Sequence, residues 1–432
     1  MKVLFIVRLF SGFERSVSER RWIPAGTPTI YKLIDALAKD SHEMEYVFTC
    51  KAVSWVCSDP SDREVEIEGL PGQTTVLAGE ARFPEWLGRL RWYFYELRQV
   101  WRALKIYRRS RPDLIYVDRG NMWIAGILAR LIRVPVVYRV MGISPGFRHI
   151  AAGNRPQQIV SRWLVRAPFG AVLCSEDGSG GEMWLDRMLR PDVPRAFLLH
   201  GVVQPDSLQT STPETWGMPR DRTIVLFVGR LETLKGCDEF IEGFLKASER
   251  QPEALHALIV GGGPREKALR VRVSEAGAER TVTFTGELTH ARVLNVYAQA
   301  DIYVSLNRMC NLTNTNVEAL SAGCCAIFPA SQPGIGADLR TDQIFPPDTV
   351  MRIPHVEDTD ALAAALLHLH SDGEERQRRA KAIARIAEQT FSNWDERIQH
   401  EISMLSSVAQ SKSHESLSTA SQVQGAGIKF EL

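Results

Sequence analysis

The stretch IVLFVGRLETLKG, residues 224–236, is the most informative part of this chain. Apolar residues of high strand propensity lead to Gly229, and the cations Arg230 and Lys235 follow five residues apart. This pattern predicts a buried strand that delivers two positive charges to one loop. Ligands bind beyond the carboxyl ends of parallel strands, so the loop suits a diphosphate. An ordinary charged surface loop would contain the same residues.

Short apolar segments alternate with helical patterns along the whole chain. This alternation predicts an α/β protein of two doubly wound Rossmann-like domains that face each other across a cleft. Strands are expected at residues 2–7, 46–50, 113–117, 134–140, 170–174, 224–228, 257–260, 282–285, 302–305 and 325–328. Helices are expected at residues 30–38, 86–109, 238–250, 265–276, 290–298, 316–322, 360–370 and 374–389.

Changes in composition set the expected domain boundaries. Residues 204–222 gather proline, serine and threonine without periodicity, as a linker does, and the residues after 405 are rich in serine, glutamine and glycine. We therefore expect an N-terminal domain at 1–205, a linker at 206–222, a C-terminal domain at 223–388, a helix at 389–406 that packs back on the first domain, and a disordered tail at 407–432.

Composition excludes several classes of protein. The net charge of +1 provides no global field for nucleic acid, which is not expected as a partner. The seven cysteines form no CxxC pair, which fits a reducing cytoplasm. The sequence has no run of about eighteen apolar residues, so no transmembrane helix is expected. An oxidoreductase is disfavoured because no GxGxxG follows a strand, and the third glycine of such a motif after Gly261 would fall at Glu266.

Four motifs follow one another in the second half of the chain. After VGRLETLKG come LIVGGGP at residues 258–264, VTFTG at 282–286, and the block YAQAD…NVEALSAG that begins at residue 297. In order and spacing they resemble the donor-binding half of the family-four glycosyltransferases of the GT-B fold, the glycosyl transferases group 1. The resemblance spans residues 224–328 and extends weakly to both halves.

The resemblance implies a reaction and a division of labour. A sugar would move from a nucleotide diphosphate sugar to an acceptor with retention of configuration. The first domain would hold the acceptor, and the second would bind the donor. No cofactor is expected beyond the donor substrate.

The resemblance also assigns residues to the donor site. Arg230 and Lys235 match the family's diphosphate-binding pair, and two fixed cations would stabilise the charge that builds on the leaving diphosphate. Glu318 matches the glutamate that holds the ribose hydroxyls; the alternative is a helix-terminal charge. Gly229 precedes the cations. Gly12 matches the glycine of the family's opening loop, although it could equally be a turn glycine.

The sequence departs from the family at two places. Cys310 replaces the first family glutamate, and Asn311, Thr313 and Asn314 are expected to contact the donor in its place. Asn311 and Asn314 could instead be turn formers. Met141 replaces a family histidine near the reacting carbon, which leaves a substrate group or one of three side chains as acceptor-side candidates. These are Asp118, Arg139 and His149.

No metal site is expected. The sequence Asp358-Thr359-Asp360 resembles a metal-binding DxD, but it directly precedes a helical pattern, where Asp and Thr are expected as N-cap residues. Metal-independent transfer is the resulting prediction.

The helix expected at residues 86–109 has two stripes. Its apolar stripe contains Leu90, Phe94, Leu97, Trp101 and Leu104, and its basic stripe contains Arg91, Arg98, Arg102, Lys105 and Arg109. The basic stripe would attract anionic lipid headgroups by about 1 kcal/mol per cation. Alternatively, the apolar stripe packs on the sheet and the basic stripe is solvated.

These features together predict a cytoplasmic hexosyltransferase, peripheral at the inner face of the membrane, that acts on a lipid-linked or envelope polysaccharide precursor. Two alternatives stay open. One is a nucleotide-sugar hydrolase or epimerase, and the other is a non-catalytic nucleotide-sugar-binding subunit.

Overall fold

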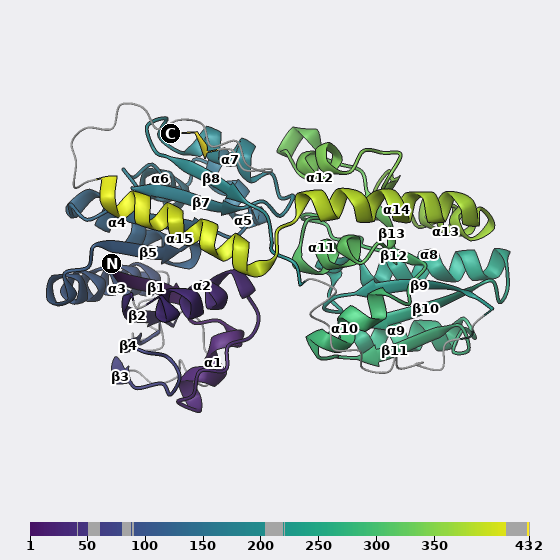
Figure 1. The fold of residues 1–432 in the computed structure, drawn as a ribbon, viewed down its shortest axis with the longest axis horizontal. Helices are drawn as coiled ribbons and strands as arrows, with labels where there is room; N and C mark the ends of the chain where they lie inside the picture. Colours follow the sequence, from purple (N-terminus) through teal and green to yellow (C-terminus); the bar gives the residue numbers. More distant parts are fainter. Residues whose placement is uncertain are drawn as a thin grey trace. The chain divides into compact units, whose positions relative to one another are not determined.

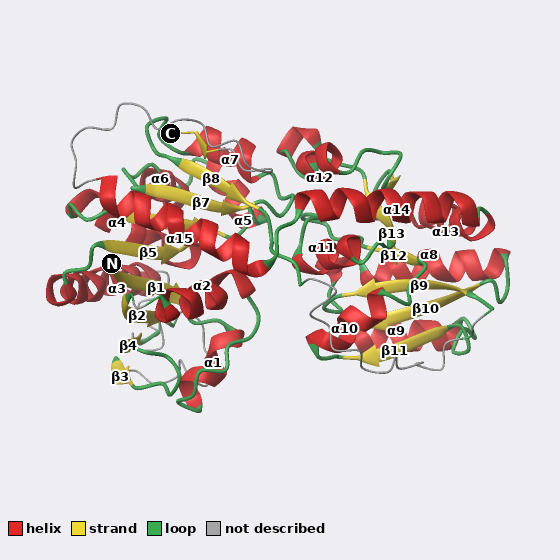
Figure 2. Ribbon diagram, in the orientation of Figure 1, coloured by secondary structure: helices red, strands yellow, loops and turns green. Residues whose placement is uncertain are grey.

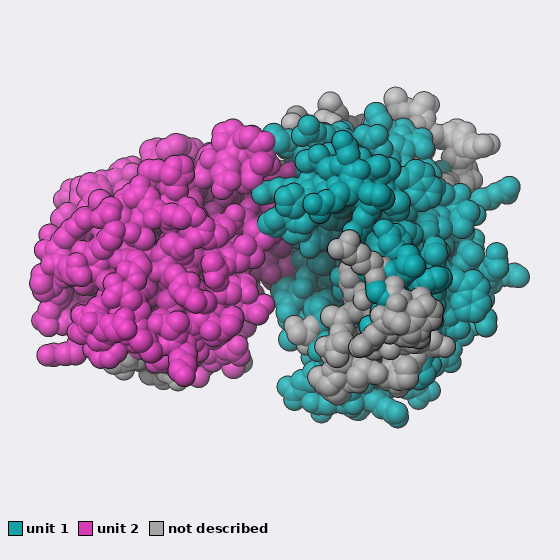
Figure 3. Space-filling view, turned by 180° about the vertical axis from the view of Figure 1, so that it is seen from behind, with its two compact units in different colours: residues 1–175, 182–198, 395–432 teal, residues 176–181, 199–394 magenta. Residues whose placement is uncertain are grey.

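The structure is a computed structural model that describes residues 1–40, 42–50, 61–79, 88, 90–203, 219, 221–411 and 430–431. It contains two compact units (Figure 1, Figure 3). Unit 1 comprises Met1–Ser175, Glu182–Leu198 and Asp395–Leu432, and unit 2 comprises Glu176–Gly181 and Leu199–Trp394. Most of the expected linker, residues 204–218 and 220, lies outside the described residues.

Unit 1 is built on a nine-stranded sheet of order β15-β8-β7-β6-β5-β1-β2-β4-β3. Its pairs are parallel except β3 with β4 and β15 with β8. The strands are β1 (Lys2–Arg8), β2 (Glu43–Thr49), β3 (Arg63–Val65), β4 (Gln73–Leu77), β5 (Leu114–Asp118), β6 (Val136–Val140), β7 (Ala171–Ser175), β8 (Arg195–Leu198) and β15 (Phe430–Glu431). The helices are α1 (Ser11–Ser18), α2 (Pro28–Lys39), α3 (Leu90–Ser110), α4 (Met122–Leu131), α5 (Pro145–Ala152), α6 (Pro156–Val165), α7 (Gly181–Met188) and α15 (Trp394–Ser411).

Helices cover both faces of this sheet (Figure 2). Side chains alternate along a strand, so Ile115 and Val117 face the core formed with α3, α4 and α6, whereas Tyr116 points to the opposite face. There the Tyr116 hydroxyl donates to the Glu401 carboxylate of α15 at 3.3 Å. The last long helix therefore packs on the sheet of unit 1, and it extends to Ser411, past its expected end at residue 406.

The orientation of α3 differs from both interpretations of its sequence. The side chains that face the core include Tyr95, Val100, Ala103 and Ile106, which belong to neither predicted stripe. Four residues of the predicted apolar stripe are instead exposed: Leu90 by 58%, Phe94 by 49%, Leu97 by 52% and Trp101 by 59%.

The predicted basic stripe of α3 is largely neutralised. Arg98 and Arg102 pair with Asp62 at 2.5 and 2.6 Å, and Arg109 pairs with Glu45 and Glu64 at 2.7 and 2.9 Å. Burial alone would raise the pKa of Asp62, but hydrogen bonds and the two guanidinium groups lower it. Binding of this stripe to anionic lipid stays a prediction, and three of its arginines already pair with carboxylates from elsewhere in the chain.

Unit 2 is built on a six-stranded sheet of order β11-β10-β9-β12-β13-β14, in which every pair is parallel. Its strands are β9 (Thr223–Val228), β10 (Leu255–Val260), β11 (Val282–Gly286), β12 (Ile302–Val304), β13 (Cys325–Pro329) and β14 (Met351–Ile353). Its helices are α8 (Cys237–Arg250), α9 (Glu266–Glu275), α10 (His290–Tyr297), α11 (Asn314–Ser321), α12 (Leu339–Ile344), α13 (Thr359–Ser371) and α14 (Gly373–Thr390).

Unit 2 has one apolar core on each face of its sheet. Val225 and Phe227 of β9 face the core formed with α8 and α13. Ile224 and Leu226 face the core formed with α10, α11 and α14. The apolar run of β9 from Ile224 to Val228 is thus explained by burial on both sides. The predicted α/β class with two Rossmann-like domains is confirmed. In the described part of the chain, no helix is both long and apolar enough to cross a bilayer.

Candidate functional site

The loops that follow β9 and β10 are packed backbone against backbone at the carboxyl edge of the unit 2 sheet. The Leu231 amide donates to the Gly262 carbonyl at 3.0 Å. Gly261 has a φ of +126°, and a Cβ there would overlap the Gly229 carbonyl oxygen. A glycine is therefore needed at position 261, because its backbone is left-handed and a side chain would separate the loops.

Gly229 is not required to be a glycine by its own backbone conformation. Its φ is not positive, and a Cβ at this position would meet only Phe227 at 3.8 Å, an ordinary contact. The glycine that sets the backbone of this loop is Gly236, with a φ of +70° and with Leu306 directly against it. Gly229 leaves open space where the chain passes from β9 to the two cations.

The two cations lie on the loop between β9 and α8. The Arg230 side chain is 73% exposed, and its ion pair with Glu232 is loose at 3.7 Å. Lys235 is half-buried and ends a short 3₁₀ turn that runs from Thr233 to Lys235. Its charge acts on the thiol of Cys310, which belongs to the loop after β12. The loops after β9 and β12 therefore meet, as the Arg308 amide shows by donating to the Leu234 carbonyl at 3.1 Å.

The amino end of α11 adds hydrogen-bond donors to this edge of the sheet. Thr313 is its N-cap, and the Thr313 side chain makes no capping hydrogen bond to the first amides. The Asn314 side-chain oxygen is buried with no hydrogen-bond partner among the described residues. An uncapped helix amino terminus favours a bound phosphate, because its free N–H groups and its dipole both attract negative charge.

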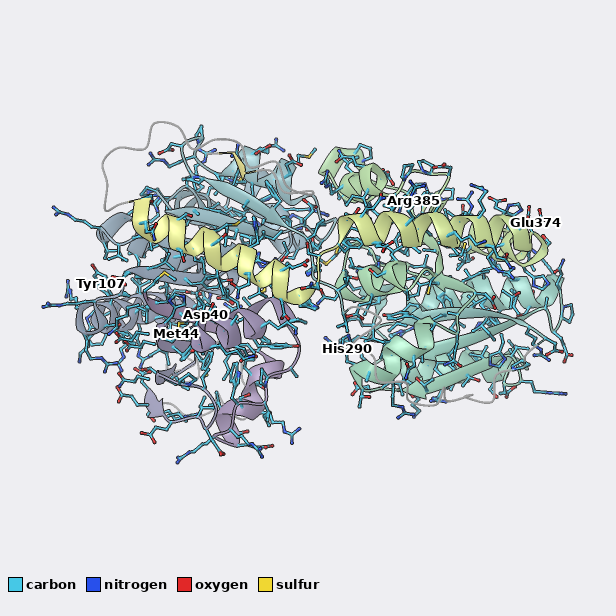
Figure 4. The ribbon with its side chains drawn as sticks, viewed as in Figure 1. Asp40, Met44, Tyr107, His290, Glu374 and Arg385 are labelled. Atoms are coloured by element: carbon cyan, nitrogen blue, oxygen red, sulfur yellow. The ribbon has the colours of Figure 1, made fainter. Side chains whose placement is uncertain are left out.

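Glu318 lies in the second turn of α11, and its side chain is 10% exposed. Its Oε1 lies 2.8 Å from Nε2 of His290, within hydrogen-bond or ion-pair distance. His290, labelled in Figure 4, begins α10. The sequence did not identify His290 as a partner of Glu318. A histidine at the start of a helix carries no signal of its own, since the pairing depends on how α10 packs on α11.

Two family models match the chain. The model described as "Glycosyl transferase 4-like domain" matches residues 26–229, and the one described as "Glycosyl transferases group 1" matches residues 209–385. The two halves of the chain thus each match a glycosyltransferase family model, and the second half matches the group 1 model. The second match contains the β9 loop, α11 and Glu318.

Curated relatives share part of this chain. The chain is 36% identical to mannosylfructose-phosphate synthase of Agrobacterium fabrum over 107 residues, which cover 23% of the chain and 24% of the relative. It is 26% identical to 2-deoxystreptamine glucosyltransferase of Streptomyces kanamyceticus over 270 residues, which cover 56% of the chain and 66% of the relative. The chain thus matches less than two thirds of the length of either relative.

Solved structures of other glycosyltransferases show the same fold. Sucrose-phosphate synthase from Thermosynechococcus elongatus superposes with a TM-score of 0.67 at 17% identity, over 94% of this chain and 99% of that one. Anabaena HepE in complex with UDP-glucose superposes with a TM-score of 0.62 at 17% identity, over 94% of this chain and 100% of that one. The fold is GT-B, with two Rossmann-like domains, as the sequence predicted.

The group 1 pattern has a glutamate where this chain has Cys310, and the structure places another carboxylate there. Asp177 belongs to Glu176–Gly181, which clusters with unit 2 although β7 of unit 1 precedes it. The Leu312 amide donates to the Asp177 carbonyl at 2.9 Å, and the Cys310 thiol donates to the Asp177 carboxylate. Burial and then the nearby Asp177 and Asp338 carboxylates raise the pKa of this thiol. Cys310 is therefore a neutral hydrogen-bond donor.

Asn311 does not have the donor-contacting position that was predicted for it. Its side chain is fully buried, and its backbone and side-chain N–H groups donate to the two carboxylate oxygens of Asp338 at 2.7 Å each. Ser305 donates to its amide oxygen at 3.1 Å. Asn311 thus fixes the loop after β12, because its polar groups bind protein atoms and none reaches the surface. The donor contacts predicted for Thr313 and Asn314, which are half-buried, stay predictions.

Four predicted site residues belong to unit 1. Gly12 lies in α1, where a Cβ would overlap the Ala25 carbonyl oxygen, so close packing accounts for this glycine. His149 is exposed on α5. Asp118 is buried at the carboxyl end of β5 and accepts from Asn121 at 2.6 Å, and burial raises its pKa.

Arg139 requires a correction. It is fully buried and lies in a core ion pair with Glu401 at 3.3 Å, so it does not reach an acceptor. It also donates hydrogen bonds to the Val140 and Leu173 carbonyls at 2.8 and 3.1 Å and to the Ser175 hydroxyl at 3.0 Å. The sequence placed a cation at the end of a strand but could not show that its side chain points into the core.

The Asp358-Thr359-Asp360 sequence caps a helix, as predicted. The Asp358 carboxylate accepts from the Ala361 amide at 2.9 Å at the start of α13, and Asp360 pairs with Lys246 and Arg250 at 2.6 and 2.8 Å. Across the described residues, no three His, Cys, Asp or Glu side chains are grouped so as to hold a metal ion.

Proposed function

We propose that this protein is a glycosyltransferase that moves a hexose from a nucleotide diphosphate sugar to an acceptor with retention of configuration. The observation that carries the proposal is the edge of unit 2, where the Arg230–Lys235 loop, the glycine loop after β10 and the uncapped end of α11 follow adjacent strands. Cations and helix amides at one edge are what a diphosphate requires.

The proposed chemistry depends on charge at the leaving group. As the glycosidic bond breaks, negative charge builds on the diphosphate, and Arg230 and Lys235 would stabilise it. Loss of one such fixed charge costs about 3 kcal/mol of barrier, or about a hundredfold in rate. Two cations supply this stabilisation without a metal ion, so we propose metal-independent transfer.

Glu318 would accept hydrogen bonds from the two ribose hydroxyls, with His290 holding its carboxylate in place. This role predicts that Glu318→Ala weakens free nucleoside diphosphate and nucleotide sugar alike. Hydrogen bonds to a charged group contribute about 1.5–3 kcal/mol, so the loss should be about tenfold or more. The first donor to test is UDP-glucose, because HepE was solved with it.

The names of two relatives support a polyhydroxylated acceptor. Their names describe transfer to a sugar phosphate and to an aminocyclitol, both polyhydroxylated. We propose a saccharide acceptor of this kind, carried by a lipid or by an envelope polysaccharide precursor, with the protein at the cytoplasmic face of the membrane.

Turnover tests the proposal directly. Purified protein is incubated with a panel of nucleotide sugars, with and without membrane extract as acceptor, and with and without EDTA. Free nucleotide that appears only with acceptor, and equally with EDTA, supports metal-independent transfer, and NMR of the product gives the anomeric configuration. Nucleotide release without acceptor identifies a hydrolase.

One alternative has a specific observation in its favour. Two family side chains are absent here, because Cys310 and Met141 stand where the pattern has a glutamate and a histidine. A non-catalytic donor-binding subunit would tolerate both losses. Donor binding without turnover of any acceptor in the same assay would identify that function.

A further inference from the structure

The exposed face of α3 is an ordered apolar surface. Its four exposed apolar residues recur at steps of four, three and four, which places them on one side of the helix. The same spacing continues into the exposed cations Lys105 and Arg108. This row, which we call the α3 outer face, comprises Leu90, Phe94, Leu97, Trp101, Lys105 and Arg108.

Charge on this face has one sign. The only acidic residue of α3 is Glu96, which is buried. The guanidinium of Arg102 and the ammonium of Lys105 each lie 5.9 Å from the centre of the Trp101 ring. An apolar stripe that ends in tryptophan and then in cations matches the boundary between acyl chains and headgroups, where tryptophan concentrates.

A hollow adjoins the basic end of the α3 outer face. It has a volume of about 380 Å³ and lies between the carboxyl ends of α3 and α4. Its lining combines apolar and cationic side chains, and Tyr107, labelled in Figure 4, is one of them. One of the lining residues, Leu131 at the end of α4, is exposed. The lining residues are Leu104, Tyr107, Arg108, Leu131, Ile132 and Arg133.

We propose that the α3 outer face binds the surface of a membrane that contains anionic lipids. Its apolar residues would enter the acyl boundary, Lys105 and Arg108 would contact headgroup phosphates, and the hollow would receive part of one lipid. The helix would lie in the plane of the interface. The proposal rests on exposed side chains rather than on the arginines that pair with acids, and it does not depend on catalysis.

Charge selects a membrane over a second copy of the chain as the partner. On a two-fold axis, this face would meet its own cations and would have no exposed acid on α3 to pair with them. Anionic headgroups provide the missing negative charge, and acyl chains receive the stripe. Like charges held opposite one another in a protein interface are destabilising, which disfavours self-association.

Flotation with vesicles tests the proposal. The full chain is mixed with vesicles of phosphatidylcholine alone or of equal parts phosphatidylcholine and phosphatidylglycerol, with no nucleotide sugar present. Wild type should float only with the anionic vesicles, and less so as salt increases. Leu97→Glu and Trp101→Glu should each lower partitioning by about tenfold or more, because each removes a side chain that would leave water.

Matched variants separate the two parts of the surface. Lys105→Glu with Arg108→Glu should lower binding to anionic vesicles by at least about fivefold. Val271→Glu, which changes an exposed apolar residue of α9, should bind like wild type. Wild type that does not float, or Leu97→Glu and Trp101→Glu that float like wild type, would overturn the proposal. So would a wild-type dimer that Trp101→Glu converts to a monomer in light scattering without vesicle binding.

Discussion

Removal of the Glu401 carboxylate should destabilise unit 1 more than any surface change. Glu401 on α15 and Arg139 on β6 have fully buried side chains, and Arg397, one turn before Glu401, is nearly so. Both guanidinium groups pair with this one carboxylate. Glu401→Ala leaves two buried cations without a counter-charge. Breaking a buried pair from one side costs about 3–5 kcal/mol, and we expect at least this much.

The assay is chemical denaturation together with hydrogen exchange measured on peptides from α15 and β6. The exchange data report unit 1 by itself, so the result does not require the two units to unfold together. Gln399→Ala, an exposed change on the same helix, is the control and should alter stability little. A loss for Glu401→Ala within about 1 kcal/mol of the control would refute the reasoning.

A compensated variant checks the cause. If uncompensated charge is responsible, Arg139→Met and Arg397→Met combined with Glu401→Leu should recover most of the loss, because apolar residues of similar volume replace buried ion pairs at little cost. No recovery would mean that shape and hydrogen bonds, rather than charge, hold α15.

The remaining predictions concern pH and the donor site. Burial alone would raise the pKa of Glu401, but Arg397 and Arg139 outweigh burial and lower that pKa. The free energy of unfolding of wild type should exceed that of Glu401→Ala by the full amount above about pH 4.3, the ordinary pKa of a glutamate. This difference should shrink as pH falls through the lowered pKa, and urea titrations at several acidic pH values measure it. Lys235→Ala should lower the rate of transfer by about a hundredfold in an assay of nucleotide release, whereas Lys246→Ala, a lysine paired with Asp360, should not. Gly261→Ala should weaken donor binding in calorimetry by pushing the Gly229 backbone aside, and Gly277→Ala, also at positive φ but with open space around it, should leave it intact. Asp177 contacts Cys310, where the family pattern has a glutamate, so Asp177→Asn should weaken binding of the nucleotide sugar but not of the free nucleotide. Cys310→Glu added to Asp177→Asn should restore binding of the nucleotide sugar. Equal binding by wild type and both variants would contradict a role for Asp177 in holding the donor.

The sequence predicted the strands of the second domain well, for a physical reason. Strands β9, β10, β12 and β13 are buried on both faces, so most of each strand reads as an apolar run between polar loops. Strands β3, β4, β8, β14 and β15 were not predicted. The sequence of β4, QTTVL, is half polar, and β14 has three residues with one arginine, so neither contrasts with its surroundings.

The two stripes of α3 were recognised, but their orientation was not. Periodicity shows which side chains share a face, and it does not show which face meets the sheet. Only the tertiary fold shows this, for example by bringing Asp62 from a distant part of the chain to Arg98 and Arg102. Asp177 escaped prediction for the same reason, because only the tertiary fold brings it to Cys310.

The return of α15 to unit 1 affects how the protein is made. Strand β6 emerges from the ribosome long before Glu401 does, since all of unit 2 is synthesised between them. During that interval Arg139 has no counter-charge from α15, and the first domain is incompletely assembled. A nascent chain that stops short of residue 401 keeps this defect permanently. A chain truncated before residue 401 should therefore be degraded by proteases of incompletely folded domains faster than the full chain.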